Sequence, residues 1–127
     1  GYILGLPGDN WKKVRSNVEF SKLIEADTSQ FYPLMVYPGT EAYEWAKNNG
    51  YLLTENYREW ITKKGLHTTT VDRSGMHAST LVKYCDIARR RFYLRPKYIL
   101  RKLRQSLKKD EFIRNFLAFK VFAKHLI

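Results

Sequence analysis

The chain contains 127 residues, among them 23 lysines and arginines and 12 aspartates and glutamates, so its formal net charge at pH 7 is +11. A single cysteine excludes an internal disulfide framework and fits a reducing cytoplasm. No apolar run reaches the roughly 18 residues that a membrane-spanning helix needs.

The first residues form a short apolar run, Tyr2-Ile3-Leu4, which is bounded by glycines. This pattern predicts a buried parallel strand near Tyr2–Leu6. Because the chain starts inside the run and without methionine, we expect it to be the C-terminal piece of a longer protein. The following Leu6-Pro7-Gly8 predicts a turn.

The segment after this turn has the pattern of an amphipathic helix that ends near Ala26-Asp27. Asp9 or Asn10 can cap its first turn. Four apolar residues recur at helical spacing and predict the buried face: Trp11, Val14, Val18 and Ile24. A second extended run near Ser29–Val36 then completes one right-handed parallel βαβ unit. Pro33 lacks a backbone donor, which predicts that it lies at a bulge or at a sheet edge.

A second break, Pro38-Gly39-Thr40, precedes the next helix. Thr40 is a good N-cap residue, and Gly50 follows the predicted helix as its C′ residue. Residues 51–71, which include the β-branched run Thr68-Thr69-Thr70-Val71, predict mostly loop with short extended pieces. The polar Asp72-Arg73-Ser74-Gly75 predicts a turn or a cap.

From about His77 onward the pattern is helical. Five residues define one apolar helix face: Leu81, Tyr84, Cys85, Ala88 and Phe92. Arg95-Pro96 predicts a break, because the residue before proline avoids the α region. The next helix should turn four residues inward: Ile99, Leu100, Leu103 and Leu107. After a junction at Lys108-Lys109-Asp110, apolar residues cover more than half of a last helix: Phe112, Ile113, Phe116, Leu117, Phe119, Val121, Phe122 and Leu126.

Charge divides the chain sharply. Residues 1–88 contain ten basic and ten acidic residues, whereas residues 89–127 contain thirteen basic and two acidic residues. A solvated helical surface explains such a tail as well as an anionic partner does. Phosphates, acidic lipid headgroups or an acidic face of a further domain are the candidate partners. We rank intramolecular packing of the tail first and peripheral membrane contact second.

The residues offer no self-contained catalytic centre. His67, His77 and His125 lack metal-ligand spacing with one another or with Cys85. Cys85 lies on the apolar face of its helix, which favours a buried core residue over a reactive thiol. The chain contains no nucleophile elbow, Walker loop or paired-cysteine zinc motif.

Together, these pieces resemble the late barrel of radical S-adenosylmethionine enzymes, most closely the group with an N-terminal cobalamin-binding domain. An apolar strand, Gly5-Leu6-Pro7-Gly8-Asp9, a helix, a second strand and Pro38-Gly39-Thr40 follow in the same order. The run Arg91-Phe92-Tyr93-Leu94-Arg95-Pro96 is similar to a run in the tail of that group. The resemblance covers residues 1–50 well, residues 88–104 reasonably and residues 51–87 only loosely.

The resemblance implies a four-iron cluster on a Cys-x3-Cys-x2-Cys loop, with S-adenosylmethionine on the open iron and, in this group, cobalamin. The chain lacks that loop, so we expect it upstream. Ile3 and Gly5 would lie on the strand that lines the adenine pocket, and Val36 and Tyr37 would touch adenine or ribose. Asp9 departs from the family, which more often has glutamate at this position.

The expected fold class is therefore a helix-rich α/β fragment, with one parallel βαβ unit from a partial (β/α) barrel followed by a C-terminal helical region. Residues 1–50 would be the late barrel, and residues 51–127 a helical extension that is strongly basic from residue 89. The expected function is that of a C-terminal fragment of an iron–sulfur oxidoreductase or methyltransferase, cytoplasmic and inactive alone, which supplies part of the S-adenosylmethionine pocket.

Two alternatives stay open. One is a basic helical module that binds nucleic acid or an anionic membrane surface, and the other is an interaction domain without a ligand. The expected partners are the missing N-terminal part of the same chain, then a second copy or an anionic membrane surface through residues 89–127. Nucleic acid is disfavoured, because Phe92 fits the core face as well as a base-stacking role.

Overall fold

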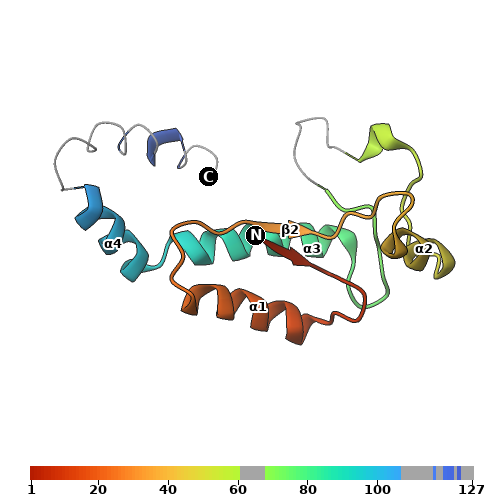
Figure 1. The fold of residues 1–127 in the computed structure, drawn as a ribbon, viewed down its shortest axis with the longest axis horizontal. Coiled ribbons are helices and arrows are strands. Elements are labelled where there is room, and N and C mark those ends of the chain that lie inside the picture. The colour runs from red at the N-terminus through yellow and green to blue at the C-terminus, as the bar shows by residue number, and fades with distance from the viewer. Residues whose placement is uncertain (61–67, 107–115, 117–118, 122, 124–127) are drawn as a thin grey trace. The chain divides into compact units, whose positions relative to one another are not determined.

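The computed structural model describes residues 1–60, 68–106, 116, 119–121 and 123. Figure 1 shows the helices and strands of the chain, which are named here in sequence order. They are β1 (Tyr2–Leu4), α1 (Trp11–Leu23), β2 (Phe31–Pro33), α2 (Glu41–Asn48), the short 3-10 helix η1 (Tyr57–Glu59), α3 (Ala78–Tyr93) and α4 (Pro96–Ser106). The described part is a helix-rich α/β structure, as the sequence predicts.

The chain forms two compact units, Gly1–Arg89 and Arg90–Ile127, so the boundary falls within α3. The first unit holds the sheet and the electrically balanced part of the sequence. The second begins almost where the excess of basic residues begins. The assignment of residues 1–50 to a barrel and of residues 51–127 to an extension stays a prediction.

The two strands pair in parallel, in the register Tyr2–Phe31, Ile3–Tyr32 and Leu4–Pro33. The Leu34 N–H donates to the Leu4 carbonyl oxygen at 2.8 Å. Because main-chain groups alternate in direction along a strand, the nitrogen of Pro33 faces the edge away from β1. The predicted parallel βαβ unit and the edge position of Pro33 are confirmed, although both strands are shorter than the predicted ranges Tyr2–Leu6 and Ser29–Val36.

Helix α1 begins as predicted and ends earlier. Asn10, not Asp9, is the N-cap, and its side-chain oxygen accepts from the Lys13 N–H at 2.9 Å. Val14 and Val18 are fully buried. The prediction for Ile24 is wrong: the helix ends at Leu23, and Ile24 is 51% exposed. Helical periodicity carries no information beyond the last turn, so it misplaces a residue that follows the helix.

Helix α2 has both of its predicted ends. The Thr40 hydroxyl accepts from the Tyr43 N–H at 3.2 Å. Gly50 takes a φ of 68° and donates to the Lys47 carbonyl, while Tyr51 donates to the Ala46 carbonyl. These two bonds form a Schellman motif, in which a left-handed residue lets the chain satisfy the last carbonyls of the helix. The helix covers a small core of Leu34, Val36, Tyr43, Ala46 and Val71.

Side chains of the β-branched run 68–71 bond it to the chain beyond β2. The Thr70 hydroxyl accepts from the Val36 N–H at 3.1 Å, and the Thr69 hydroxyl donates to the Leu34 carbonyl. Val71 also forms an antiparallel bridge with Leu52. Within the described residues of 51–71, the Leu52–Val71 bridge confirms a short extended piece in a loop, whereas the helical turn η1 is not predicted from the sequence.

Helix α3 buries the predicted face, with Leu81, Cys85, Ala88 and Phe92 at most 3% exposed. Pro96 opens α4 after a break at Arg95, as predicted. The predicted inward face of α4 is wrong, because Leu100 and Leu103 are both 55% exposed and Ile99 is 39% exposed.

The other predictions for the tail fall largely outside the described residues, among them Leu107, the junction at 108–110, and Phe112, Ile113, Leu117, Phe122 and Leu126 of the last helix. Of the described positions, Phe116, Phe119 and Val121 are exposed.

Candidate functional site

The carboxyl ends of β1 and β2 lie at the same edge, because the strands are parallel and Leu34 is bonded directly to Leu4. Two glycine turns leave this edge. One is the Gly5–Asp9 turn after β1, and the other, Pro38-Gly39-Thr40, follows β2. Parallel α/β folds bind ligands outside the carboxyl ends of their strands. This edge is therefore the candidate site.

The Gly5–Asp9 turn is closed by its own carboxylate. The Asp9 Oδ2 atom accepts from the backbone N–H groups of Gly5, at 3.1 Å, and Leu6, at 3.0 Å. Successive backbone N–H groups of this kind form the anion-binding nests of phosphate loops. Here the anion is supplied by the chain itself, so these two donors are not offered to a phosphate. Asp9 thus holds the turn together.

Arg73 holds the same turn from the other side. Its Nη2 atom donates to the carbonyl oxygens of Gly5, at 3.4 Å, and Asp9, at 3.3 Å. The guanidinium also lies 5.5 Å from the centre of the Trp45 ring, a cation–π contact with α2. One side chain thus joins the turn after β1 to the helix after β2.

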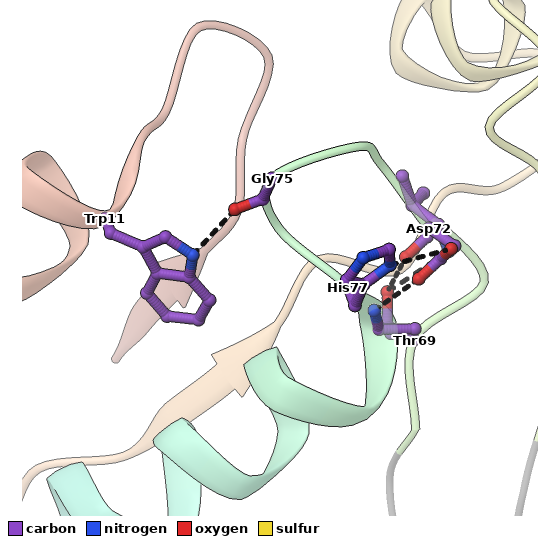
Figure 2. Close-up of polar contacts among 7 residues, drawn as sticks. Trp11, Thr69, Asp72, Gly75 and His77 are labelled. Carbon is purple, nitrogen blue, oxygen red and sulfur yellow. Dashed lines mark hydrogen bonds and ion pairs between the residues drawn. The ribbon is translucent and has the colours of Figure 1, made fainter.

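The 72–76 segment, which carries Arg73, is fastened at both ends (Figure 2). The Trp11 indole N–H donates to the Gly75 carbonyl oxygen at 2.7 Å. At the other end, Asp72 Oδ1 accepts from the Ala78 N–H at 2.6 Å, and Asp72 Oδ2 lies 3.4 Å from the Nδ1 atom of His77. The bond from Ala78 is the main cause that lowers the pKa of Asp72; burial opposes it and His77 adds to it. The predicted turn or cap at 72–75 is confirmed: residues 73–76 form a turn, and the Asp72 side chain caps the first N–H of α3.

The chain beyond β2 presents one exposed aromatic ring. Tyr37 is 52% exposed, and its ring meets the buried Trp60 edge to face at 5.4 Å. Its hydroxyl donates to the Met35 sulfur at 3.1 Å, and its carbonyl accepts from Thr40. The carbonyl oxygen of Tyr37 thus serves the turn, while about half of the residue's surface stays exposed.

The four predicted site residues lie in β1, just after it and in the chain beyond β2, and they differ in exposure. Ile3, 52% exposed, occupies the face of β1 opposite the buried Leu4. Val36 is 1% exposed and its N–H is bonded to Thr70, so it belongs to the core. Their assignment to a cofactor pocket stays a prediction.

Gly5 has structural reasons to be glycine. Its φ is 91°, and an added Cβ would lie 2.6 Å from the Cδ2 atom of Leu81. The backbone conformation and helix α3, rather than a ligand, already require the absence of a side chain here.

The residues present do not fit an iron–sulfur cluster. Cys85 is the only cysteine of the chain, it is 2% exposed, and burial raises its pKa to about 12, with a smaller contribution from Asp86. The predicted buried core residue is confirmed. Within the described ranges, no group of three or more His, Cys, Asp or Glu side chains could hold a metal ion. His67 and His125 lie outside those ranges.

Sequence reasoning missed Arg73 and Trp60. The sequence identifies Arg73 only as part of a polar turn, because nothing local distinguishes it from a solvated arginine. Trp60 stood in a segment without clear periodicity. A tryptophan in a polar loop is the one signal that could have marked Trp60 as buried, because burying an aromatic side chain contributes a large favourable free energy.

Among the described residues, no helix is long and apolar enough to cross a membrane.

Comparison with known proteins gives a partial match. No protein-family model matches the chain, and no solved structure does. The chain is 33% identical over 104 residues to an uncharacterized methyltransferase of Pyrococcus horikoshii. The aligned region covers 79% of this chain and 21% of that protein. It is 40% identical over 42 residues to an uncharacterized protein of Methanocaldococcus jannaschii. This aligned region covers 33% of this chain and 13% of that protein. The chain thus spans about a fifth of the length of the archaeal methyltransferase to which it is similar.

Proposed function

We propose that this chain is the C-terminal part of a methyltransferase or oxidoreductase of the radical S-adenosylmethionine type, in which it forms one wall of the cofactor pocket. The observation that carries the proposal is the edge shared by β1 and β2, where the Gly5–Asp9 turn follows one strand and the half-exposed Tyr37 follows the other. Similarity to an archaeal protein named as a methyltransferase supports it. The iron–sulfur cluster and cobalamin would be held by the remainder of the protein.

Tyr37 is the residue best placed to recognise the adenine ring. Its own ring is steadied on one edge by Trp60 and is 52% exposed, which leaves an aromatic surface for stacking. Ile3 adds an exposed aliphatic side chain on β1. Gly5 and Val36 would shape the wall of the pocket without hydrogen-bonding the cofactor through their N–H groups, because both groups already donate to side chains of this chain. Bound S-adenosylmethionine would supply the radical chemistry.

Calorimetric titration of the full-length protein with S-adenosylmethionine tests the proposal. Stacking of a base on an aromatic side chain is worth about 1–3 kcal/mol, so Tyr37→Leu should weaken binding about tenfold or more. Tyr37→Phe is the matched control, since it keeps the ring, and its affinity should stay close to that of the wild type. No binding by the wild type, or equal affinities for all three proteins, would contradict the proposed pocket.

A further inference from the structure

Helix α4 turns its aromatic and cationic side toward its own unit. The Tyr98 ring lies 5.6 Å from the Phe92 ring and 5.4 Å from the Tyr93 ring. The Arg101 guanidinium and the Lys102 ammonium lie 5.4 Å and 5.9 Å from the centre of the same ring. Aromatic packing and cation–π contacts therefore decide which side of α4 faces inward.

The opposite side of α4 is aliphatic and exposed. Because an α-helix turns about 100° per residue, Ile99, Leu100 and Leu103 fall within an arc of about 100° that points away from Tyr98. Leu100 and Leu103 are each 55% exposed, and Ile99 is 39% exposed. Leu94, in the break just before the helix, is 61% exposed. A row of exposed aliphatic side chains on one helix face marks a surface for interaction.

The charges around this aliphatic row are all of one sign. Residues 89–106 include eight lysines and arginines and no acidic residue. Lys97 and Arg104 project beside the row and are exposed, as are Arg90 and Arg91 on the preceding helix. Whatever covers the row must therefore be apolar at its centre and negatively charged at its rim. A second copy would bring basic residues against basic residues, and nucleic acid offers no aliphatic layer.

We propose that the aliphatic row Ile99–Leu100–Leu103, with its basic flanks, docks on a membrane surface that contains anionic lipid. The leucines would enter the boundary between headgroups and acyl chains, and the basic side chains would reach the lipid phosphates and carboxylates. This surface differs from the edge of β1 and β2, and the proposal stands whether or not that edge binds S-adenosylmethionine.

Vesicle co-sedimentation of the 127-residue chain tests the proposal. The wild type should pellet with phosphatidylcholine vesicles that contain phosphatidylserine, should not pellet with phosphatidylcholine alone, and should be released by salt. The double variant Leu100→Gln/Leu103→Gln should bind about tenfold more weakly or worse, because two apolar side chains no longer enter the membrane. Lys97→Gln/Arg104→Gln should weaken binding by at least about tenfold through lost attraction to anionic lipid.

Leu23→Gln is the matched control, because Leu23 is 78% exposed at the end of α1 in the other unit. It should bind like the wild type, and circular dichroism should show equal helix content for all variants, since glutamine is a good helix former. Binding that ignores the leucines would overturn the proposal, because it would be charge attraction alone. A dimer that needs the leucines, seen by light scattering without vesicle binding, would overturn it too, and so would a full-length protein that fails to bind.

Discussion

Gly5 and Leu81 pack so closely that a Cβ atom on the glycine would lie 2.6 Å from the leucine Cδ2 atom. Gly5 directly follows β1. Leu81 is buried, with 3% of its surface exposed, in helix α3, which starts more than seventy residues later. The contact brings the start of the candidate site against the longest helix. It also gives a physical reason for a glycine that a sequence pattern alone ascribes to ligand approach.

Gly5→Ala is expected to lower the free energy of unfolding by about 2 kcal/mol or more. About 1–2 kcal/mol comes from the left-handed φ, and the clash with Leu81 adds to it. Gly8→Ala is the matched control, since its φ of 80° imposes the same strain but nothing lies within 4 Å of the added atom. Urea denaturation of both variants measures the difference. Equal losses would mean that Leu81 yields without cost.

Arg73→Gln is expected to lower the free energy of unfolding by about 1 kcal/mol, since two hydrogen bonds to carbonyl oxygens and a contact with Trp45 are lost. Arg58→Gln changes an exposed arginine of η1 and should leave stability nearly unchanged. Hydrogen exchange should locate the effect of Arg73→Gln in the Gly5–Asp9 turn. Unchanged exchange there would show that the turn does not depend on Arg73.

Asp72→Ala is expected to lower the free energy of unfolding by about 1 kcal/mol near neutral pH, because Asp72 caps the first N–H of α3. The folded-state pKa of Asp72 lies below its ordinary value of 3.8. The stabilisation is therefore complete above pH 3.8 and is lost as the pH falls through the folded-state value. Denaturation of wild type and variant across this range should give a difference that shrinks only in acid. A difference that shrinks well above pH 3.8 would contradict this assignment.

Cys85 is expected to resist thiol reagents in the folded protein and to react fully in denaturant. It is 2% exposed and its pKa is raised to about 12, so the reactive thiolate is scarce. Since the folded-state pKa is raised, stability is complete below the ordinary value of 9.0 and falls as the pH rises toward about 12. Native labelling faster than global unfolding would disprove the burial.

The isolated chain is expected to assemble no four-iron cluster on anaerobic reconstitution, because one thiolate cannot replace the three cysteines that such a cluster takes from its protein. Iron and sulfide analysis after gel filtration measures this. Cys85→Ser serves as the baseline for adventitious iron. A stoichiometric cluster in the wild type that is absent from the variant would refute the reasoning.

Features that depend on neighbours along the chain could be predicted from the amino-acid sequence. Asn10 and Thr40 bond N–H groups three residues ahead, and Gly50 closes α2 through carbonyls within five residues. Pro96 ends one helix and opens the next because of its own ring. The periodic face of α3 was also predictable, since sixteen helical residues leave its apolar stripe well defined.

The folded chain, rather than local pattern, sets which surfaces are covered and what each turn residue does. Leu100 and Leu103 have the pattern of a core face, yet Tyr98 takes the inward place because Phe92 and Tyr93 meet it there. Asp9 closes its own turn because that turn brings the carboxylate back to Gly5. Both outcomes depend on how the chain folds back at a turn or a break, which helical periodicity does not encode. Arg73 and Leu81 reach Gly5 from more than sixty residues along the chain, and a local pattern holds no record of that approach.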